Sequence, residues 1–530
     1  MLRSGGRTAS RVRDDVDRHV GRWYRVAAST ALGVVVLAVL GAVMGPQWDP
    51  VPLADPLLVE SSSTAIGDAA PAQEYEVRTS VVSVQLDGAT VEVQISVPVG
   101  LDEPAPGVVF VHGAGTGRYD TAFLEQARAL AASGIVAMVP NKRLDTYTTR
   151  HRDYVLMAAD YEASVAVLRS YPGVDPDRVG IYAESEGGWI APVMAAQDRS
   201  IAFVVLVSSP VVPPREQAAF AVDSYLRNTG VPNGVFRAIP RAVGMTLPGG
   251  GFEYADFDVT GYQRQMRQPV LVVYGTGDAS MPVIQGAAQV LQDTAVAGNE
   301  DVTVRYYEGA NHGIRVHGDV DRVFLRDLSG WVLGLPATGD ARPQVAGAQP
   351  VQTYVAEPVA EPRWFGDGDV VLALATAAVG LIVLGPLAVL VARSGEEAID
   401  RVRRRRGAAA VAVAGPRFAR GVPLRLAALG TGAILTVLAL LWYLVAVARL
   451  ALDYQRNDLV VQGGWVAVRV LGIAVVVVGV LLLRRCRRIR LAGGVPAPGI
   501  LRTVVLWAGV IGSVVLLVIL AYWGVFQLGI

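Results

Sequence analysis

The chain has 530 residues, of which 52% are hydrophobic and 18% charged, and its mean hydropathy of +0.39 is too apolar for an ordinary soluble protein. Basic and acidic side chains both number 47, so net charge gives no argument for binding to nucleic acid. The single cysteine, Cys486, excludes an intramolecular disulfide and a cysteine-based metal cluster, and neither a metal nor a cofactor is expected.

The amino-terminal end has the pattern of a membrane anchor. Residues 1–25 are rich in arginine and are expected to stay in the cytoplasm, whereas residues 26–44 are uncharged, apolar and just long enough to cross a bilayer. A cleaved signal peptide is the alternative, but no clear small-x-small cleavage site follows. We favour an uncleaved anchor, and under both interpretations the following segment is exported.

A soluble α/β pattern follows a linker rich in Pro, Ser and Ala at residues 45–74. Alternating runs on either side of Asp87 and Gly88 predict a β-hairpin. Strands are then expected at 108–111, 135–139, 179–183, 201–207, 270–274 and 302–307, and helices at 121–133, 154–170, 189–196, 283–291 and 320–333. A leading hairpin followed by repeated βα units predicts a doubly wound, mostly parallel sheet over residues 75–335.

This alternation lapses over residues 211–268. The insertion carries several aromatic residues, namely Tyr225, Phe236, Phe252, Tyr254 and Tyr262. Because long loops in compact domains are usually functional, we interpret it as a cap over the site, with a surface excursion as the alternative.

A second linker, residues 336–369, leads to a four-helix transmembrane region at residues 370–530. Its apolar runs cover residues 370–391, 426–447, 466–483 and 504–526. Arginine clusters at 401–406 and 484–490 fall on the same side as the amino-terminal cluster when the chain crosses five times. We therefore predict a multi-pass protein of a bacterial plasma membrane, with residues 75–335 and the carboxyl terminus outside the cytoplasm.

The spans hold almost no ionisable residues, which disfavours a transporter or a proton relay. Arg469 is the exception, and it lies close enough to the outer end of its helix to reach the interface. Membrane lipids are expected partners. For the polybasic stretch Arg403–Arg406 we favour a topology signal over a lipid-binding site.

The predicted chemistry begins at Ser185. Residues 179–183 predict a short buried strand, and a helix begins near Trp189 after a sharp polar turn. A serine between a strand and a helix is the context of a nucleophile elbow, which needs small residues two positions before and after the serine. Ala183 and Gly187 occupy those positions, so Ser185 is the candidate nucleophile, with an ordinary turn serine as the alternative.

An acid and a base follow in the order that this arrangement requires. Asp278 stands on a glycine-rich turn after strand 270–274, and His312 follows strand 302–307 between Asn and Gly. The order Ser, Asp, His predicts a catalytic triad, with His317 as the reserve base.

Two backbone N–H groups are needed to stabilise a developing oxyanion. One is expected from Glu186, the residue after the nucleophile, and the other from the glycine-rich loop after strand 108–111. We choose Ala114 as the second donor, with Gly113 as the alternative.

These segments resemble the α/β-hydrolase superfamily, and the sequence Ser185-Glu-Gly-Gly-Trp189 is most similar to its dienelactone-hydrolase-like and prolyl-oligopeptidase-like esterase branches. The resemblance covers about residues 78–335 and none of the spans. It places the superfamily's triad and oxyanion positions on Ser185, Asp278, His312, Ala114 and Glu186. Ala183 departs from the glycine that the family usually has at that position.

Two glutamates, Glu184 and Glu186, flank the nucleophile. We favour a helix-capping role for one of them over repulsion of anionic substrates or hydrogen bonding within the pocket.

The sequence thus predicts a membrane-anchored, extracytoplasmic serine hydrolase of small-molecule or lipid esters or thioesters. Envelope acyl transfer and peptide cleavage on the same triad are enzymatic alternatives. A scaffold or sensor with a ligand-binding hydrolase-like domain is the non-enzymatic alternative.

Overall fold

The computed structural model describes residues 5–66, 74–405, 417–453 and 455–528. Side chains are described from residue 23 onward and not at residues 403–404, so the polybasic Arg403–Arg406 stretch and the carboxyl-terminal Ile530 lie largely outside the described residues. The chain forms two compact units. One comprises residues 49–224 and 251–359, and the other comprises residues 1–48, 225–250 and 360–530.

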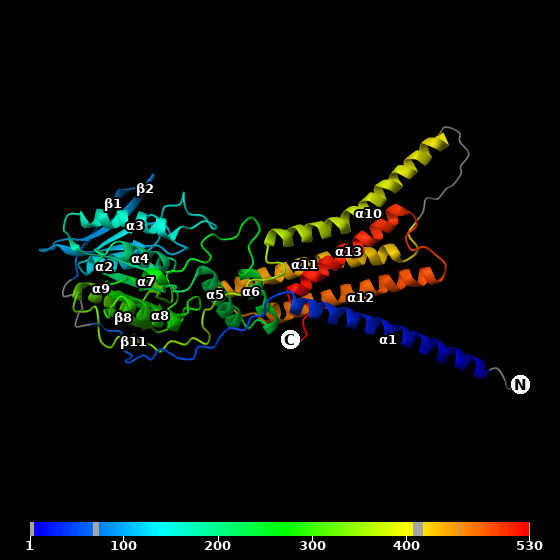
Figure 1. Cartoon of the computed structure of the whole chain (residues 1–530), viewed down its shortest axis with the longest axis horizontal. Helices are drawn as coiled ribbons and strands as arrows, with labels where there is room; N and C mark the ends of the chain where they lie inside the picture. Colours follow the sequence, from blue (N-terminus) through cyan, green and yellow to red (C-terminus); the bar gives the residue numbers. More distant parts are fainter. Residues whose placement is uncertain (1–4, 67–73, 406–416, 454, 529–530) are drawn as a thin grey trace. The chain divides into compact units, whose positions relative to one another are not determined.

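The first unit is built on a nine-stranded sheet with the order β1-β2-β4-β3-β5-β6-β7-β8-β11, seen edge-on among its helices in Figure 1. The strands are β1 (Val77–Leu86), β2 (Ala89–Pro98), β3 (Ala105–Val111), β4 (Val136–Pro140), β5 (Val174–Glu184), β6 (Val204–Val207), β7 (Val270–Gly275), β8 (Val302–Tyr307) and β11 (Val345–Gly347). Only the β1–β2 and β2–β4 pairings are antiparallel. The predicted doubly wound, mostly parallel sheet with a leading hairpin is therefore confirmed.

Helices cover this sheet, and the central strands are buried along their whole length, as expected for parallel strands. The helices are α2 (Leu124–Ala132), α3 (Tyr154–Arg169), α4 (Gly187–Gln197), α5 (Pro214–Thr229), α7 (Thr260–Gln263), α8 (Val283–Val296) and α9 (Arg322–Gly334), and a small separate hairpin pairs β9 (Arg315–Val316) with β10 (Asp319–Val320).

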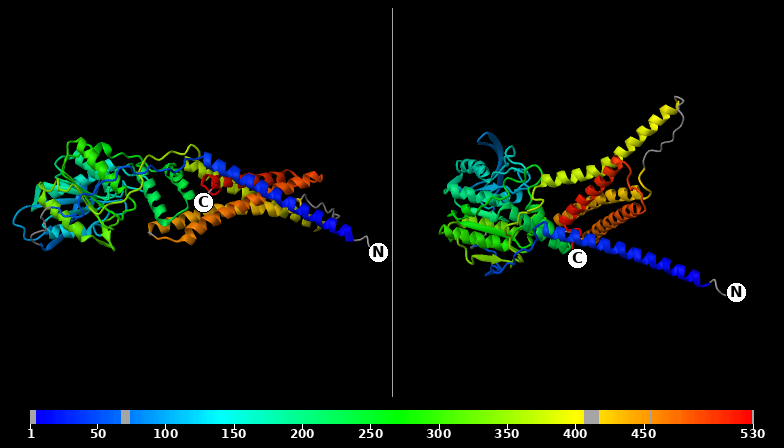
Figure 2. Two further views of the ribbon diagram at one scale, coloured as in Figure 1. Left: turned by 90° about the horizontal axis from the view of Figure 1, so that it is seen from below. Right: turned by 45° about the vertical axis from the view of Figure 1, so that its right-hand side comes forward.

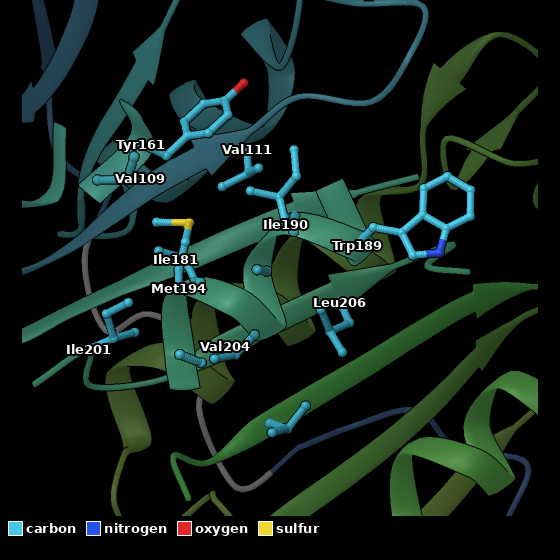
Figure 3. Packing of buried hydrophobic residues seen from close by; sticks show 14 of the residues in the cluster. Val109, Val111, Tyr161, Ile181, Trp189, Ile190, Met194, Ile201, Val204 and Leu206 are labelled. Atoms are coloured by element: carbon cyan, nitrogen blue, oxygen red, sulfur yellow. The ribbon is translucent and has the colours of Figure 1, made fainter. Parts of the chain in front are cut away.

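Helix α4, which follows the candidate nucleophile, is buried on nearly every side. Figure 3 shows Ile190 and Met194 packed above the strands that carry Val109, Ile181 and Leu206. All of these side chains are buried. The turn that carries Ser185 therefore joins a central strand to a helix fixed in the core.

Both predicted linkers contribute ordered structure to this unit. The second contains β11, which pairs in parallel with β8 at the sheet edge. The first meets the second through isolated bridges that join Pro52 to Tyr354 and Ser61 to Ala346. The two bridges join residues 302 and 285 positions apart, and the Pro- and Ala-rich composition of the linkers does not indicate such pairing.

The second unit contains five helices that are, within the described residues, long and apolar enough to cross a membrane. They lie in α1 (Gly5–Val43), α10 (Gly368–Arg405), α11 (Val422–Leu452), α12 (Gly464–Leu491, preceded by the π-helical turn η2, Leu459–Gly463) and α13 (Ile500–Tyr522). Helices α11, α12 and α13 lie side by side in the views of Figures 1 and 2.

Part of the predicted cap belongs to this second unit. Residues 225–250, which contain η1 (Asn233–Arg237) and α6 (Ala238–Val243), group with the apolar helices. Fully buried Arg241 donates hydrogen bonds to the carbonyl oxygens of Gly45, Pro46 and Tyr522. Because these carbonyls lie at the ends of α1 and α13, residues 225–250 are fixed to the ends of these two helices.

Candidate active site

Ser185 stands at a strained turn between β5 and α4. Its backbone has φ 56°, in the left-handed region that non-glycine residues rarely adopt. A Cβ at Gly187 would lie 2.8 Å from the carbonyl oxygen of Val111, and one at Gly188 would lie 2.6 Å from Ser209 Cβ. The turn therefore requires glycine at both positions. Ala183, the departure from the usual pattern, is accommodated in the buried strand β5.

The predicted acid and base are joined by a hydrogen bond. His312 Nδ1 lies 2.9 Å from Asp278 Oδ2. Asp278 follows β7 and His312 follows β8, which are adjacent parallel strands, and Ser185 follows β5 in the same sheet. All three residues therefore lie beyond the carboxyl edge of one parallel sheet. No hydrogen bond joins Ser185 Oγ to His312 in the described part of the chain, and such bonds often form only when substrate is bound.

The electrostatics of this pair suit a general base held by a carboxylate. Burial by itself lowers the pKa of His312, but the hydrogen bond and charge of Asp278, together with the charge of Glu184, raise it above the ordinary value. Burial raises the pKa of Asp278, and its interactions with His312 and Ser280 outweigh burial and lower it. Asp278 therefore stays ionised, and its negative charge stabilises the protonated form of His312.

Ser280 is a site residue that sequence reasoning missed. Its hydroxyl lies 2.6 Å from Asp278 Oδ1 and 3.0 Å from His312 Nδ1, and its backbone N–H donates to the same carboxylate oxygen at 2.9 Å. The available signal was the Asp-x-Ser spacing, since an aspartate commonly accepts a hydrogen bond from the backbone two residues on. Ser280 fixes the carboxylate that orients the histidine.

The glycine-rich loop after β3 lies against Ser185. A Cβ built on Gly113 would lie 3.0 Å from Ser185 Cβ and 3.6 Å from its Oγ, so only glycine leaves room beside the serine. The carbonyl oxygen of Gly113 accepts a hydrogen bond from Lys142 Nζ at 2.6 Å. Because a trans peptide directs its C=O and N–H groups oppositely, this contact directs the N–H of Ala114 away from Lys142.

Lys142, the only lysine in the chain, is buried with a carboxylate that follows the nucleophile. Its Nζ lies 3.0 Å from Glu186 Oε2. The same carboxylate accepts hydrogen bonds from Tyr147 at 3.0 Å and from Arg152 at 2.5 Å. Burial lowers the pKa of Lys142, against the opposing charge and hydrogen bond of Glu186. This cluster joins the loop of Gly113 to the turn of Ser185.

The interpretation of a flanking glutamate as a helix cap is wrong. Glu186 occupies the N-cap position of α4 but makes no side-chain capping hydrogen bond. Its carboxylate instead accepts hydrogen bonds from Lys142, Tyr147 and Arg152. Glu184 instead accepts a 3.4 Å hydrogen bond from Tyr182, and burial raises its pKa while the charge of His312 opposes that rise.

The other histidines with described side chains have different surroundings. His112 is fully buried, and its ring nitrogens lie 2.6 Å from the Pro140 oxygen and 3.2 Å from Thr116 Oγ1. Burial lowers its pKa to about 4, so the ring is neutral and holds the glycine-rich loop to β4. His151 pairs with Glu253. His317, the reserve base, has a left-handed backbone with φ 55° between β9 and β10.

No group of three or more His, Cys, Asp or Glu side chains suited to a metal ion occurs among the residues described.

The pH dependence of turnover provides a test of the base. His312 accepts a proton only when neutral, so activity should fall as the pH drops through its raised pKa. Replacing Glu184 by Gln removes one negative charge that raises this pKa, so the acid limb of kcat/KM should move to lower pH. The exposed Glu308→Gln, on the loop before His312, supplies the same charge change as a control. An acid limb that stays in place in Glu184→Gln would contradict His312 as the base.

Comparison with known proteins identifies one matching family model. Residues 160–316 match the family model described as BAAT / Acyl-CoA thioester hydrolase C terminal, and this range includes Ser185, Asp278 and His312. No curated protein matches the chain.

Solved structures resemble about half of the chain. A protein from Klebsiella pneumoniae described as a dienelactone hydrolase shares 17% identity over 50% of this chain and 98% of its own, with a TM-score of 0.33. An esterase from Pyrobaculum calidifontis shares 18% sequence identity, and the match covers 49% of this chain and 84% of the esterase, with a TM-score of 0.37. A fungal esterase from Rhizomucor miehei shares 16% sequence identity, and the match covers 50% of this chain and 86% of the esterase, with a TM-score of 0.37.

Proposed function

We propose that this chain, which combines the α/β-hydrolase fold with five helices in its described part that are long and apolar enough to cross a membrane, is a membrane-anchored serine hydrolase of carboxylic esters or thioesters. The observation that carries the proposal is the Asp278–His312 hydrogen bond beyond the same sheet edge as the strained Ser185 turn. A base oriented by a buried carboxylate near a half-buried serine elbow is the arrangement of nucleophilic acyl transfer.

In the proposed reaction, Ser185 Oγ attacks the acyl carbon while His312 Nε2 takes its proton. The tetrahedral oxyanion collapses to an acyl-enzyme, and the imidazolium returns the proton to the departing alkoxide or thiolate. Water then attacks the acyl carbon with His312 again as base, which releases the carboxylic acid and restores Ser185. Asp278 stays ionised and stabilises the imidazolium in both steps.

The N–H groups of Ala114 and Glu186 are the proposed oxyanion donors. Two observations support this choice: the close approach of Gly113 to Ser185, and the orientation that Lys142 imposes on the peptide between Gly113 and Ala114. The match to a thioester hydrolase model favours acyl substrates with good leaving groups over peptides.

The arginine clusters support a proposal for the side of the membrane on which the site lies. We propose that residues 75–335 lie outside the cytoplasm, since five crossings place the clusters at 1–25, 401–406 and 484–490 together on the inner side.

One experiment tests both reaction and side. Intact cells are treated with a membrane-impermeant fluorophosphonate, and the purified full-length protein is assayed with a short-chain ester, an acyl thioester and a peptide. We expect labelling of Ser185 in unbroken cells and turnover of the ester and thioester. Labelling that needs cell lysis would overturn the proposed side, and turnover of the peptide alone would overturn the substrate class.

A further inference from the structure

A large basic cavity lies among the apolar helices, at the ends that carry the arginine clusters. It has a volume of about 740 Å³ and is lined by residues of α1, α11 and α12. Five arginines line it: Arg25, Arg425, Arg484, Arg487 and Arg488. Its volume falls within the roughly 300–1,000 Å³ typical of ligand-binding pockets. The described lining residues include no Asp or Glu.

The arrangement of α12 concentrates charge on this cavity. Leu481, Arg484, Arg488 and Leu491 follow the spacing of one helix face. Arg484 and Leu481 lie on this face, so α12 presents both a cationic and an apolar side chain to the cavity.

One arginine has an unmet hydrogen-bonding group. Arg484 Nη1 is buried and has no hydrogen-bond partner in the described structure. A buried charged donor without an acceptor is unfavourable, and the described lining offers it no carboxylate. Guanidinium groups match the oxygens of a phosphate in a fork geometry, so the arginines that line the cavity suit a phosphate ligand.

The apolar part of the cavity indicates where such a phosphate comes from. Trp23 of α1 and Leu481 of α12 line it beside the arginines. Tryptophan is enriched at the level of lipid head groups, and an apolar wall beside a cationic one suits an acyl chain attached to an anionic head. A topology signal needs positive charge on one side of the membrane, but it does not need arginines from three helices to surround one cavity.

We propose that this cavity binds the phosphate head group of an anionic membrane phospholipid, with the acyl chains running along the neighbouring helices. Basic pockets between transmembrane helices are suited to such head groups. This site is separate from the proposed hydrolytic site and does not depend on its chemistry.

The test uses delipidated full-length protein in detergent, with thermal unfolding and native mass spectrometry as readouts. The probes are phosphatidylglycerol, phosphatidylcholine and inorganic phosphate at matched ionic strength. We expect phosphatidylglycerol to bind and to raise Tm, and the other two to do so far less. Equal stabilisation by inorganic phosphate would make this a free-anion site. Equal binding of phosphatidylcholine, whose phosphate is balanced by the choline cation, would mean that the cavity does not recognise a net anionic head group. Each result overturns the proposal.

Variants localise the effect. Arg484→Gln/Arg487→Gln should weaken phosphatidylglycerol binding by about tenfold or more, because each lost arginine removes charge-assisted hydrogen bonds. Arg401→Gln/Arg490→Gln makes the same charge change outside the cavity lining and should leave binding unchanged. Equal loss in both pairs would overturn the proposal. If the first pair fails to insert, Arg484→Lys keeps the charge and should still weaken binding through loss of the fork.

Discussion

Ser185→Ala is expected to lower kcat by roughly 10⁴–10⁶-fold while leaving the fold intact. The substitution removes Oγ, the atom proposed to attack the acyl carbon, and keeps the Cβ that the strained turn already accommodates at φ 56°. Ser185 Oγ makes no side-chain hydrogen bond among the described residues, so its loss leaves no protein partner unsatisfied. Turnover of a short-chain ester and thermal unfolding of the same sample measure the two expectations.

Ser280→Ala serves as the matched control for this variant. It also removes one hydroxyl from the site, but that hydroxyl contacts Asp278 and His312 and is not the proposed nucleophile. Fluorophosphonate labelling should persist in Ser280→Ala and disappear in Ser185→Ala. Labelling or turnover that survives in Ser185→Ala would exclude Ser185 as the nucleophile.

The sheet and the acid–base pair were predictable because local sequence specifies them. Parallel strands buried on both faces appear as short apolar runs, and the residues that carry chemistry follow those runs directly. Asp278 and His312 each stand within five residues of a strand end, and the structure joins them at 2.9 Å. The two residues meet because each follows one of two neighbouring parallel strands, and the βα alternation of the sequence predicts such neighbours.

The cluster behind the nucleophile was not predictable in the same way. Lys142 and Glu186 are 44 residues apart, and nothing in the local sequence of either residue indicates a buried partner. Sequence reasoning therefore assigned the glutamate to its nearest helix end. A tertiary contact replaced that local one, because a buried carboxylate is stabilised more by Lys142 and Arg152 than by a helix terminus.

The placement of residues 225–250 depended on contacts that are equally remote. The insertion looked like a cap because it interrupts an α/β pattern. The structure adds that Arg241 contacts backbone carbonyls of Gly45 and Tyr522, about 200 and 280 positions away along the chain. No spacing in the sequence indicates that a buried arginine will find its hydrogen-bond acceptors among backbone carbonyls so far away along the chain.

Lys142→Met is expected to lower kcat by about 10²-fold with little change in KM, because removal of one oxyanion donor typically costs about 10²–10³-fold. Lys142 is proposed as a positioning residue. Its Nζ donates to the Gly113 carbonyl oxygen at 2.6 Å, and we propose that this contact orients the N–H of Ala114 toward the developing oxyanion. An oxyanion forms only in the transition state, so the loss should appear in kcat rather than in substrate affinity.

The fold should survive this substitution. Methionine is apolar and similar in length to lysine, and Glu186 keeps its 2.5 Å ion pair with Arg152 and its 3.0 Å hydrogen bond from Tyr147. Arg143→Met is the matched control, since this neighbouring cation pairs with Asp145 and does not contact Gly113. It should retain nearly full kcat, and both variants should unfold at temperatures close to that of the parent protein.

A transition-state analogue separates positioning from general damage. A trifluoromethyl ketone that forms a tetrahedral adduct on Ser185 should bind Lys142→Met more weakly by about the same factor as kcat/KM falls, whereas a substrate-like ester should bind nearly as well as before. Lys142→Arg, which retains a cationic donor, should recover part of both losses. Equal weakening of both ligands, or a loss of kcat matched by Arg143→Met, would mean that Lys142 supports the fold and does not orient the oxyanion donor.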